Sequence, residues 1–430
     1  MSSRRRVVIT GLGAITPLGH SIVQTWQQIL AAKSGIGKIT HFDASGFPSQ
    51  IAGEVKQFDF EPWIRQNPKL EASMSNTRFA IVACDEAVRD SGLDWQKLDP
   101  YRTGIYYAAG DGGSDIEDLA RAFKLSENAA QEFDIHKYNE ALLRFGTCIR
   151  DNEKEPSSTL KHLVERYPVQ GPAYNCLTAC AASAQAIGEA LEMIRRGETD
   201  VMLSGGAHSM IHPFGVTGFC LLTTLSTMND DPAHASRPFD RTRHGFVLSE
   251  GAGAVILEEY EHAKKRNAKI YGELIGYGST ADAYRLTDSH PEGEGASHAI
   301  EYALADANVK PEQIEYINAH GTSTKVNDMV ETLAIKKALK EHAYTIGVSS
   351  TKSMTGHLIA AAGVVELEFC LLAMRDKILP PTINYQNPDP ECDLDYIPNT
   401  PRQKAIQCAM SNSFGFGGQN VVLIVRKDLS

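Results

Sequence analysis

The stretch Gly171-Pro172-Ala173-Tyr174-Asn175-Cys176-Leu177-Thr178-Ala179-Cys180-Ala181-Ala182-Ser183-Ala184 decides the fold expected around it. A short apolar run precedes Cys180, and from Ile187 apolar residues recur at the spacing of one helix face. Cys180 is therefore predicted to lie where a strand turns into a helix. A helix N-terminus favours a thiolate over a thiol, by at most about one pKa unit. A buried structural cysteine is an equally good interpretation of this stretch alone.

Composition narrows the class of protein. The chain has 430 residues, 42% of them hydrophobic and 22% charged, which is typical of a globular protein of two or three domains. The net charge of −11 argues against non-specific binding of nucleic acid. No apolar run approaches the roughly 18 residues of a membrane span, and residues 1–6 lead into Val7 without a signal segment, so we expect a cytoplasmic protein. Eight cysteines without paired spacing predict neither a disulfide framework nor a zinc site.

The chain alternates strand and helix patterns from its start. Residues 6–10 predict a buried strand and 11–19 a glycine-rich turn, which lacks the third glycine of a dinucleotide-binding fingerprint. A helix is expected at 74–91, a strand at 103–109 and a hairpin at 245–258.

From residue 270 the same order starts again. This repetition predicts a duplicated α/β unit with sheets buried between helix layers and a boundary near 260–270, although chance similarity remains open. The matching segments are 271–278 with the opening strand and its glycines, 297–307 with the helix at 74–91, 314–321 with 104–110, and 348–374 with the Cys180 strand and helix.

Two histidines follow strands of the second half. Because open α/β sheets bind ligands at the carboxyl ends of their strands, we expect His320 and His357 to lie near Cys180. Each histidine alone could be structural. Together the three residues suit acyl transfer through a cysteine thioester, with neutral imidazoles donating hydrogen bonds to an enolate. The glycines at 411–420 would free a backbone N–H for an oxyanion.

Seven segments carry a family resemblance that spans nearly the whole chain. The chain resembles the β-ketoacyl-[acyl carrier protein] synthases, most closely the elongating synthase II type. The resemblance implies an α/β thiolase-like fold, in which two duplicated halves, residues 1–265 and 266–430, form a layered α-β-α-β-α core. The segments are 7–13, 178–181, 236–240, 318–324, 349–357, 380–384 and 412–418.

The resemblance also implies roles for individual residues. Cys180 would accept the acyl group, and His320 and His357 would form the decarboxylation pair. Lys352 would organise the site through Glu366. The further implied residues are Asp328 and Glu331 as supports of the second-half loops, the N–H groups of Cys180 and Phe416 as oxyanion hole with Phe416 as gate, and Thr322, Thr324, Asp111 and Phe414 as substrate-binding residues.

Some positions depart from the family pattern and bear on the substrate. Asp111 stands where fatty acid synthases have an apolar tunnel residue, Thr223 replaces an arginine, and Gln419 replaces a threonine. Other stretches are similar to the ketosynthase subunit of type II polyketide systems. We therefore expect condensation of malonyl-carrier with an acyl group on Cys180, with a leaning to a specialised or polyketide pathway. The alternatives are a housekeeping fatty acid elongation synthase II and, more distantly, a non-catalytic partner subunit.

The expected partner is an acyl carrier protein. The resemblance further implies a homodimer, or a heterodimer with a ketosynthase-like chain-length subunit. Neither a metal nor an organic cofactor is expected, because the pantetheine arm belongs to the carrier. Arg65 and Lys69 are candidates for a basic patch that meets an acidic carrier.

Overall fold

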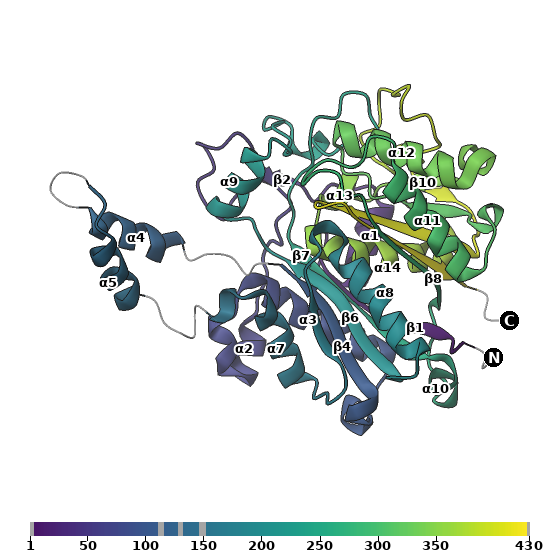
Figure 1. Cartoon of the computed structure of the whole chain (residues 1–430), viewed down its shortest axis with the longest axis horizontal. Coiled ribbons are helices and arrows are strands. Elements are labelled where there is room, and N and C mark those ends of the chain that lie inside the picture. The colour runs from purple at the N-terminus through teal and green to yellow at the C-terminus, as the bar shows by residue number, and fades with distance from the viewer. Residues whose placement is uncertain (1–3, 111–115, 128–131, 146–151, 428–430) are drawn as a thin grey trace.

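A ten-stranded mixed sheet runs through the whole molecule (Figure 1). The computed structural model describes residues 4–110, 116–127, 132–145 and 152–427. The strands of this sheet are β1 (Val7–Ile15), β4 (Thr103–Ala109), β5 (Ala173–Cys176), β6 (Val201–His208), β7 (Gly251–Glu259), β8 (Gly272–Ala281), β9 (Tyr316–Asn318), β10 (Gly347–Ser349), β13 (Cys408–Gly415) and β14 (Gln419–Arg426). Two short ribbons accompany it: β2 (Gly37–Lys38) with β3 (Ile51–Ala52), and β11 (Ile378–Leu379) with β12 (Arg402–Gln403).

The two halves of the sheet have equivalent arrangements of five strands, each counted from its outer edge to the centre of the sheet. One half reads β5-β4-β6-β7-β1 and the other β10-β9-β13-β14-β8. In each half the first three strands are parallel and the last two pair antiparallel. The halves meet where β1 pairs with β8, at Val8 with Glu273 and Ile9 with Gly272. The predicted duplication of an α/β unit is therefore confirmed.

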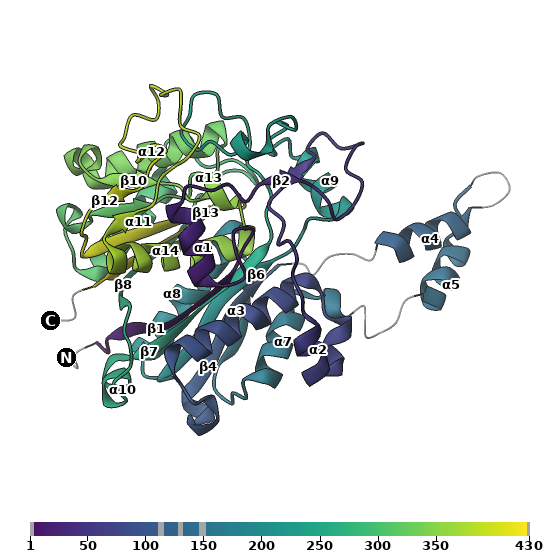
Figure 2. The same ribbon diagram turned by 180° about the vertical axis from the view of Figure 1, so that it is seen from behind.

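Helices cover the two half-sheets in three layers. The central pair, α8 (Ala182–Arg195) and α14 (Ala362–Asp376), contacts strands of both halves, and every residue of α14 from Ala362 to Met374 is buried. The sequence of α14 over this stretch is apolar except at Glu366 and Glu368, as a helix buried on all sides requires. The outer layers are α3 (Ser75–Ser91) with α7 (Pro156–Arg166), and α11 (Glu294–Ala307) with α12 (Lys325–Leu339). The expected α-β-α-β-α layering is present (Figure 2).

The remaining helices lie around this core. They are α1 (Ile22–Leu30), α2 (Glu61–Gln66), α4 (Ile116–Ser126), α5 (Ile135–Phe145), α9 (Pro213–Leu221), α10 (Tyr260–Lys265) and α13 (Lys352–Thr355). Two of them, α4 and α5, form a helical pair that projects from the body in both views (Figures 1 and 2). Among the residues described, no helix combines the length and the apolar character needed to cross a membrane.

The glycine-rich turn expected after residue 10 is wrong, because β1 continues through Gly11 and Gly13 to Ile15. A Cβ atom on either glycine would come within 3.0 Å of a carbonyl oxygen of α3. These glycines therefore let α3 pack directly on the strand. In the other half, Gly276 and Gly278 of β8 face α11 in the same way.

The hairpin expected at 245–258 is also absent. Residues Gly251–Glu259 form the single strand β7, which lies between β1 and β6. Gly251 and Gly253 are typical of a turn, but in a sheet covered on both faces a glycine also marks close packing.

A short turn of the same kind precedes each of the two central helices. A one-turn 3-10 helix, Ala179–Ala181, precedes α8, and another, Ile359–Ala361, precedes α14. Their first residues have positive φ angles of 49° at Ala179 and 45° at Ile359. The helix expected within 348–374, from His357 to Met374, therefore begins only at Ala362, and Cys180 and Ala360 occupy equivalent positions in the two halves.

Candidate active site

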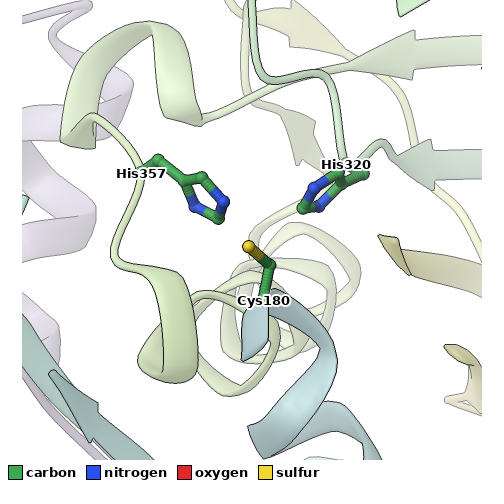
Figure 3. Close-up of side chains that lie close together, drawn as sticks. All are labelled: Cys180, His320 and His357. Atoms are coloured by element: carbon green, nitrogen blue, oxygen red, sulfur yellow. The ribbon is translucent and has the colours of Figure 1, made fainter. Parts of the chain in front are cut away.

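Cys180, His320 and His357 meet at the carboxyl ends of the strands (Figure 3). Their sulfur and ring nitrogen atoms lie within 4.8 Å of one another. Cys180 comes from the turn after β5, His320 follows β9, and His357 follows α13. All three side chains are at least 96% buried. The structure thus brings together three residues that are 177 positions apart in sequence from first to last, as sequence reasoning expected.

A cavity of about 450 Å³ leads to these three side chains. Thr322, Thr324 and Phe414, expected to bind substrate, and Phe416, expected to act as gate, line it. Sequence reasoning did not assign several further lining residues to the site. Leu222, Thr224, His244, Phe246, Thr287, Asp288 and Ser289 come from loops that carry no motif, and Val326 and Asn327 lie in the first turn of α12.

The loop geometry around His357 fixes which ring nitrogen carries the proton. The backbone N–H of Ile359 donates to Nδ1 over 3.3 Å, so in the neutral ring the proton is on Nε2. Nε2 is buried without a hydrogen-bond partner in the described part of the chain. Gly356 before it has a φ of 68°, and a Cβ atom there would overlap Ser249 Oγ, so this position requires glycine. His357 therefore presents a hydrogen-bond donor to the site.

Both histidines are held in the neutral form. Burial lowers the pKa of His320 and of His357 well below the ordinary value, and the nearby charge of Lys352 lowers both further. The two rings stand almost perpendicular, at 81°, with centroids 5.2 Å apart. Two neutral imidazoles beside one sulfur can donate hydrogen bonds to a developing anion without becoming charged themselves.

The helix N-terminus, expected to favour the Cys180 thiolate by at most about one pKa unit, does not by itself make the thiolate the main form. Burial raises the pKa of the Cys180 thiol to about 11 and outweighs the backbone N–H groups of Phe416 and Cys180 and the charge of Lys352, which lower it. The small residues that admit substrate also bury the sulfur. Deprotonation must therefore accompany attack on the substrate, with a histidine within reach as base.

Two backbone N–H groups converge on the Cys180 sulfur, those of Phe416 and of Cys180 itself. Gly415 makes this approach possible, because a Cβ atom there would lie 3.2 Å from the backbone nitrogens of Cys180 and Ala181. Donors in this position can receive the oxygen of an acyl group bonded to the sulfur.

A buried ion pair lies behind the histidines. Lys352 Nζ on α13 donates to a carboxylate oxygen of Glu366 on α14, and the two side chains are 1% and 4% exposed. Burial raises the pKa of Glu366 to about 7, against the opposing effect of Lys352. The predicted contact between these two residues is therefore present.

Glu331 on α12 holds the loop that carries His320. Its two carboxylate oxygens accept the backbone N–H groups of His320 at 2.8 Å and Gly321 at 2.7 Å, and it also accepts from Asn412. Burial raises the pKa of Glu331 to about 7. Asp328, one turn earlier on α12, accepts the N–H of Phe239 at 2.8 Å and that of Ser323 at 3.2 Å.

Three predicted residues lie outside this arrangement. Arg65 and Lys69 are exposed and do not line the cavity. Asp111 lies outside the described residues.

A metal ion is poorly suited to this cluster. The spacing of Cys180, His320 and His357 would allow one. However, a metal needs an imidazole nitrogen without a proton, whereas the N–H of Ile359 occupies His357 Nδ1 and leaves the proton on Nε2, the nitrogen that would have to bind the ion.

Both halves of the chain match models of one family. Residues 4–263 match "Beta-ketoacyl synthase, N-terminal domain" and residues 271–386 match "Beta-ketoacyl synthase, C-terminal domain". The chain belongs to the β-ketoacyl synthase family, which makes it an enzyme of acyl transfer and confirms the predicted resemblance.

Relatives of known name cover the chain from end to end. It is 43% identical to 3-oxoacyl-[acyl-carrier-protein] synthase 2 of Coxiella burnetii over 435 residues, covering 99% of both chains. It is 43% identical to the synthase 2 of Synechocystis over 429 residues, covering 99% of this chain and 98% of that one.

Solved structures of ketosynthases share the fold. One is a type II polyketide ketosynthase in complex with its acyl-carrier protein and bound to a hexaketide, with a TM-score of 0.87 and 35% identity over 99% of this chain and all of that one. Another is the ishigamide ketosynthase/chain length factor, with a TM-score of 0.87 and 32% identity over the same shares of the two chains. The thiolase-like fold implied by the sequence is confirmed.

Proposed function

We propose that the chain catalyses the decarboxylative condensation of malonyl-carrier with an acyl group held on Cys180. The observation that carries this proposal is the meeting of a buried sulfur, two backbone N–H donors and two neutral imidazoles at the end of one cavity. The two backbone N–H groups can hold the oxyanion of a tetrahedral intermediate, and the two imidazoles can hold the oxygen of an enolate. Together with the sulfur they form one site.

In the first half-reaction the Cys180 sulfur attacks the thioester carbonyl of an acyl-carrier. Its proton passes to a histidine and then to the departing carrier thiol, so that the acyl group changes from one sulfur to another. The N–H groups of Cys180 and Phe416 hold the oxyanion of the tetrahedral intermediate.

In the second half-reaction malonyl-carrier loses its carboxylate as CO2. The electron pair of the broken bond forms an enolate, whose oxygen accepts hydrogen bonds from His320 and His357. The enolate carbon then attacks the acyl carbonyl, Cys180 leaves as the thiolate, and the product is a 3-oxoacyl-carrier. Because decarboxylation supplies the carbanion, the reaction needs neither a metal nor an organic cofactor.

Elongation of fatty acyl chains is the better supported pathway. The relatives with 43% identity carry the name of the elongating synthase 2, whereas the polyketide ketosynthases share 35% and 32% identity. The leaning to a polyketide pathway is therefore not confirmed, and it stays the second candidate because of those structural neighbours. The intact set of Cys180, His320, Lys352 and His357 disfavours a non-catalytic partner subunit.

The carrier and a second ketosynthase-like subunit are the proposed partners. One edge of the sheet is closed, because the N–H of Val348 in β10 donates to the Asp395 carbonyl over 2.8 Å. At the other edge β5 is the outermost strand, and Tyr174 and Leu177 are 51% and 59% exposed. An open strand edge with apolar neighbours suits pairing with a second subunit, identical or related. The division into domains 1–265 and 266–430 and the cytoplasmic location stay predictions.

Mass spectrometry of the intact protein tests the reaction. After incubation with saturated and polyunsaturated acyl-carriers, we expect a mass gain on Cys180 that malonyl-carrier discharges. The Cys180→Ala variant should show no gain, while Cys408→Ala, which changes a buried cysteine at the far end of β13, should load as the native protein does. Malonyl decarboxylation should disappear in His320→Ala. Retained condensation in Cys180→Ala, or unchanged decarboxylation in His320→Ala, would refute the proposed function.

A further inference from the structure

His208, the last residue of β6, is a buried histidine that the proposed mechanism does not use. His208 is only 2% exposed, and within the described ranges neither nitrogen of its ring has a hydrogen-bond partner. Burial and, to a smaller extent, the neighbouring His212 lower its pKa to about 3, so the ring is neutral. A neutral imidazole has one N–H donor and one acceptor nitrogen, and here both are left without a partner. Such a group needs a ligand or a water molecule to satisfy it.

The register of β6 shows where this side chain points. A Cβ atom on Gly206 would lie 2.5 Å from the Ala360 carbonyl and 2.8 Å from Ser183 Cβ, so that residue faces the central helix layer. His208, two residues further along the strand, faces the same side. Its Nδ1 lies 3.5 Å from the Cβ position of Gly110, just beyond the end of β4. The ring thus occupies the side of the sheet on which Cys180 and the Ile359 turn lie.

His208 is also near the reacting groups. It lies close enough to His357 that a charge on its ring would lower the pKa of His357. Cys180 itself packs in a mostly apolar cluster that also includes Ile211, which is three residues after His208 in sequence. The buried members of that cluster include Ile211, Val216, Leu225, Phe246, Leu248 and Ile359. An alkyl chain on Cys180 would find apolar walls there, with one polar side chain beside them.

We propose that His208 is a specificity-determining residue, which hydrogen-bonds a ketone or hydroxyl oxygen on the acyl chain bound to Cys180. This inference rests on the proposed condensation reaction and favours its second candidate pathway, in which the acyl chain carries oxygen. The ring N–H donates to a keto or hydroxyl oxygen, and the other nitrogen accepts from a hydroxyl. A fully saturated chain leaves both nitrogens unpaired, so the site favours oxygen-bearing chains over saturated ones of equal length.

Acylation rates of Cys180 with matched thioesters test the proposal. The probes are N-acetylcysteamine thioesters of octanoic acid and of its 3-oxo, 5-oxo and 7-oxo derivatives, which differ by one oxygen. The proteins are the native chain, His208→Leu, which is apolar, and His208→Gln, which keeps a donor and an acceptor. His234→Leu serves as the control, because the side chain of His234 is 50% exposed and pairs with Asp231 on the surface.

In the native protein we expect at least one oxo thioester to acylate Cys180 faster than octanoyl does. His208→Leu should reduce that ratio about tenfold, which corresponds to about 1.4 kcal/mol, by slowing the oxo thioester and not octanoyl. His208→Gln should give an intermediate ratio, and His234→Leu should leave it unchanged.

Equal ratios in the native protein, His208→Leu and His208→Gln at all three oxo positions would overturn the proposal and leave a bound water as the partner of His208. If His208→Leu does not fold by circular dichroism, His208→Gln against the native protein decides in the same way. Failure of the proposed function looks different: the folded native protein would then be acylated by none of the thioesters and would not condense with malonyl-carrier.

Discussion

Both halves of the molecule have a one-turn 3-10 helix before their central helix, but the residue at the middle of that turn differs. In the first half the 3-10 turn before α8 presents Cys180 to a cavity, and in the second half the equivalent turn before α14 presents Ala360. The Ala360 carbonyl lies against Gly206 of β6, where a Cβ atom would come within 2.5 Å, so this turn is packed under the sheet. The second half contributes instead His320, His357 and the Lys352–Glu366 pair. Duplication thus supplied the scaffold, whereas the chemistry is divided unequally between its copies.

The strongest way to test this division is to move the nucleophile. We expect Cys180→Ala to lower the condensation rate by more than about a thousandfold, as removal of a covalent nucleophile does. The double variant Cys180→Ala with Ala360→Cys should stay inactive, because the second turn has no access to the cavity. Product formation measured by mass spectrometry checks both, and recovery of activity in the double variant would show that the halves are interchangeable.

The ion pair confined to the second half should dominate the stability of the site. Lys352→Met leaves the Glu366 carboxylate buried without its cation, which should destabilise the fold by about 3–5 kcal/mol in urea unfolding. Adding Glu366→Gln should recover part of this loss, since the buried charge is then gone. A loss under 1 kcal/mol in Lys352→Met would mean that the pair contributes little.

The glycines that the halves have in common should respond alike. Gly13→Ala and Gly278→Ala each force a methyl group against a carbonyl oxygen of the covering helix, at Ala83 in α3 and Ala299 in α11. We expect each variant to lose about 1–3 kcal/mol of stability, with little change in the rate of condensation. Thermal unfolding of both variants measures this, and a large difference between them would limit the equivalence of the two helix–strand contacts.

Of the changes considered, a change of pH should affect activity least, but it should measurably change the free energy of unfolding. The folded-state pKa values of His208, His320 and His357 lie below the ordinary value of about 6.5, so the unfolded chain binds more protons below that pH. The free energy of unfolding should therefore decrease as the pH falls below about 6.5, because proton binding to these histidines favours the unfolded chain. Malonyl decarboxylation should show no histidine titration between about pH 6 and 8, because both site histidines remain neutral. Any change centred near pH 7 should come from Glu331 or Glu366, whose pKa values are about 7, and should disappear when that residue is changed to Gln. A loss near 6.5 that persists in both Gln variants would contradict the lowered pKa values of the histidines.

Motifs predicted the site better than they predicted the local backbone. Cys180, His320, His357 and the Lys352–Glu366 contact could be foreseen, since short motifs at strand ends determine both residue type and position. The strands through Gly11, Gly13 and Gly251 could not, because a glycine in sequence does not tell a turn from close helix packing. His208 carried no motif, and only the strand register shows that it lies on the side of β6 that faces the central helix layer.

The amino-acid sequence alone determined the alternation of strands and helices, their duplication and the family, because these depend on local periodicity and on motifs along the chain. Tertiary structure alone decided the chemical state of the site. The raised pKa of Cys180, the neutral histidines and the proton on His357 Nε2 all follow from burial and from a hydrogen bond at Ile359. Burial depends on what segments distant in sequence place around a group, and no stretch of sequence contains that information.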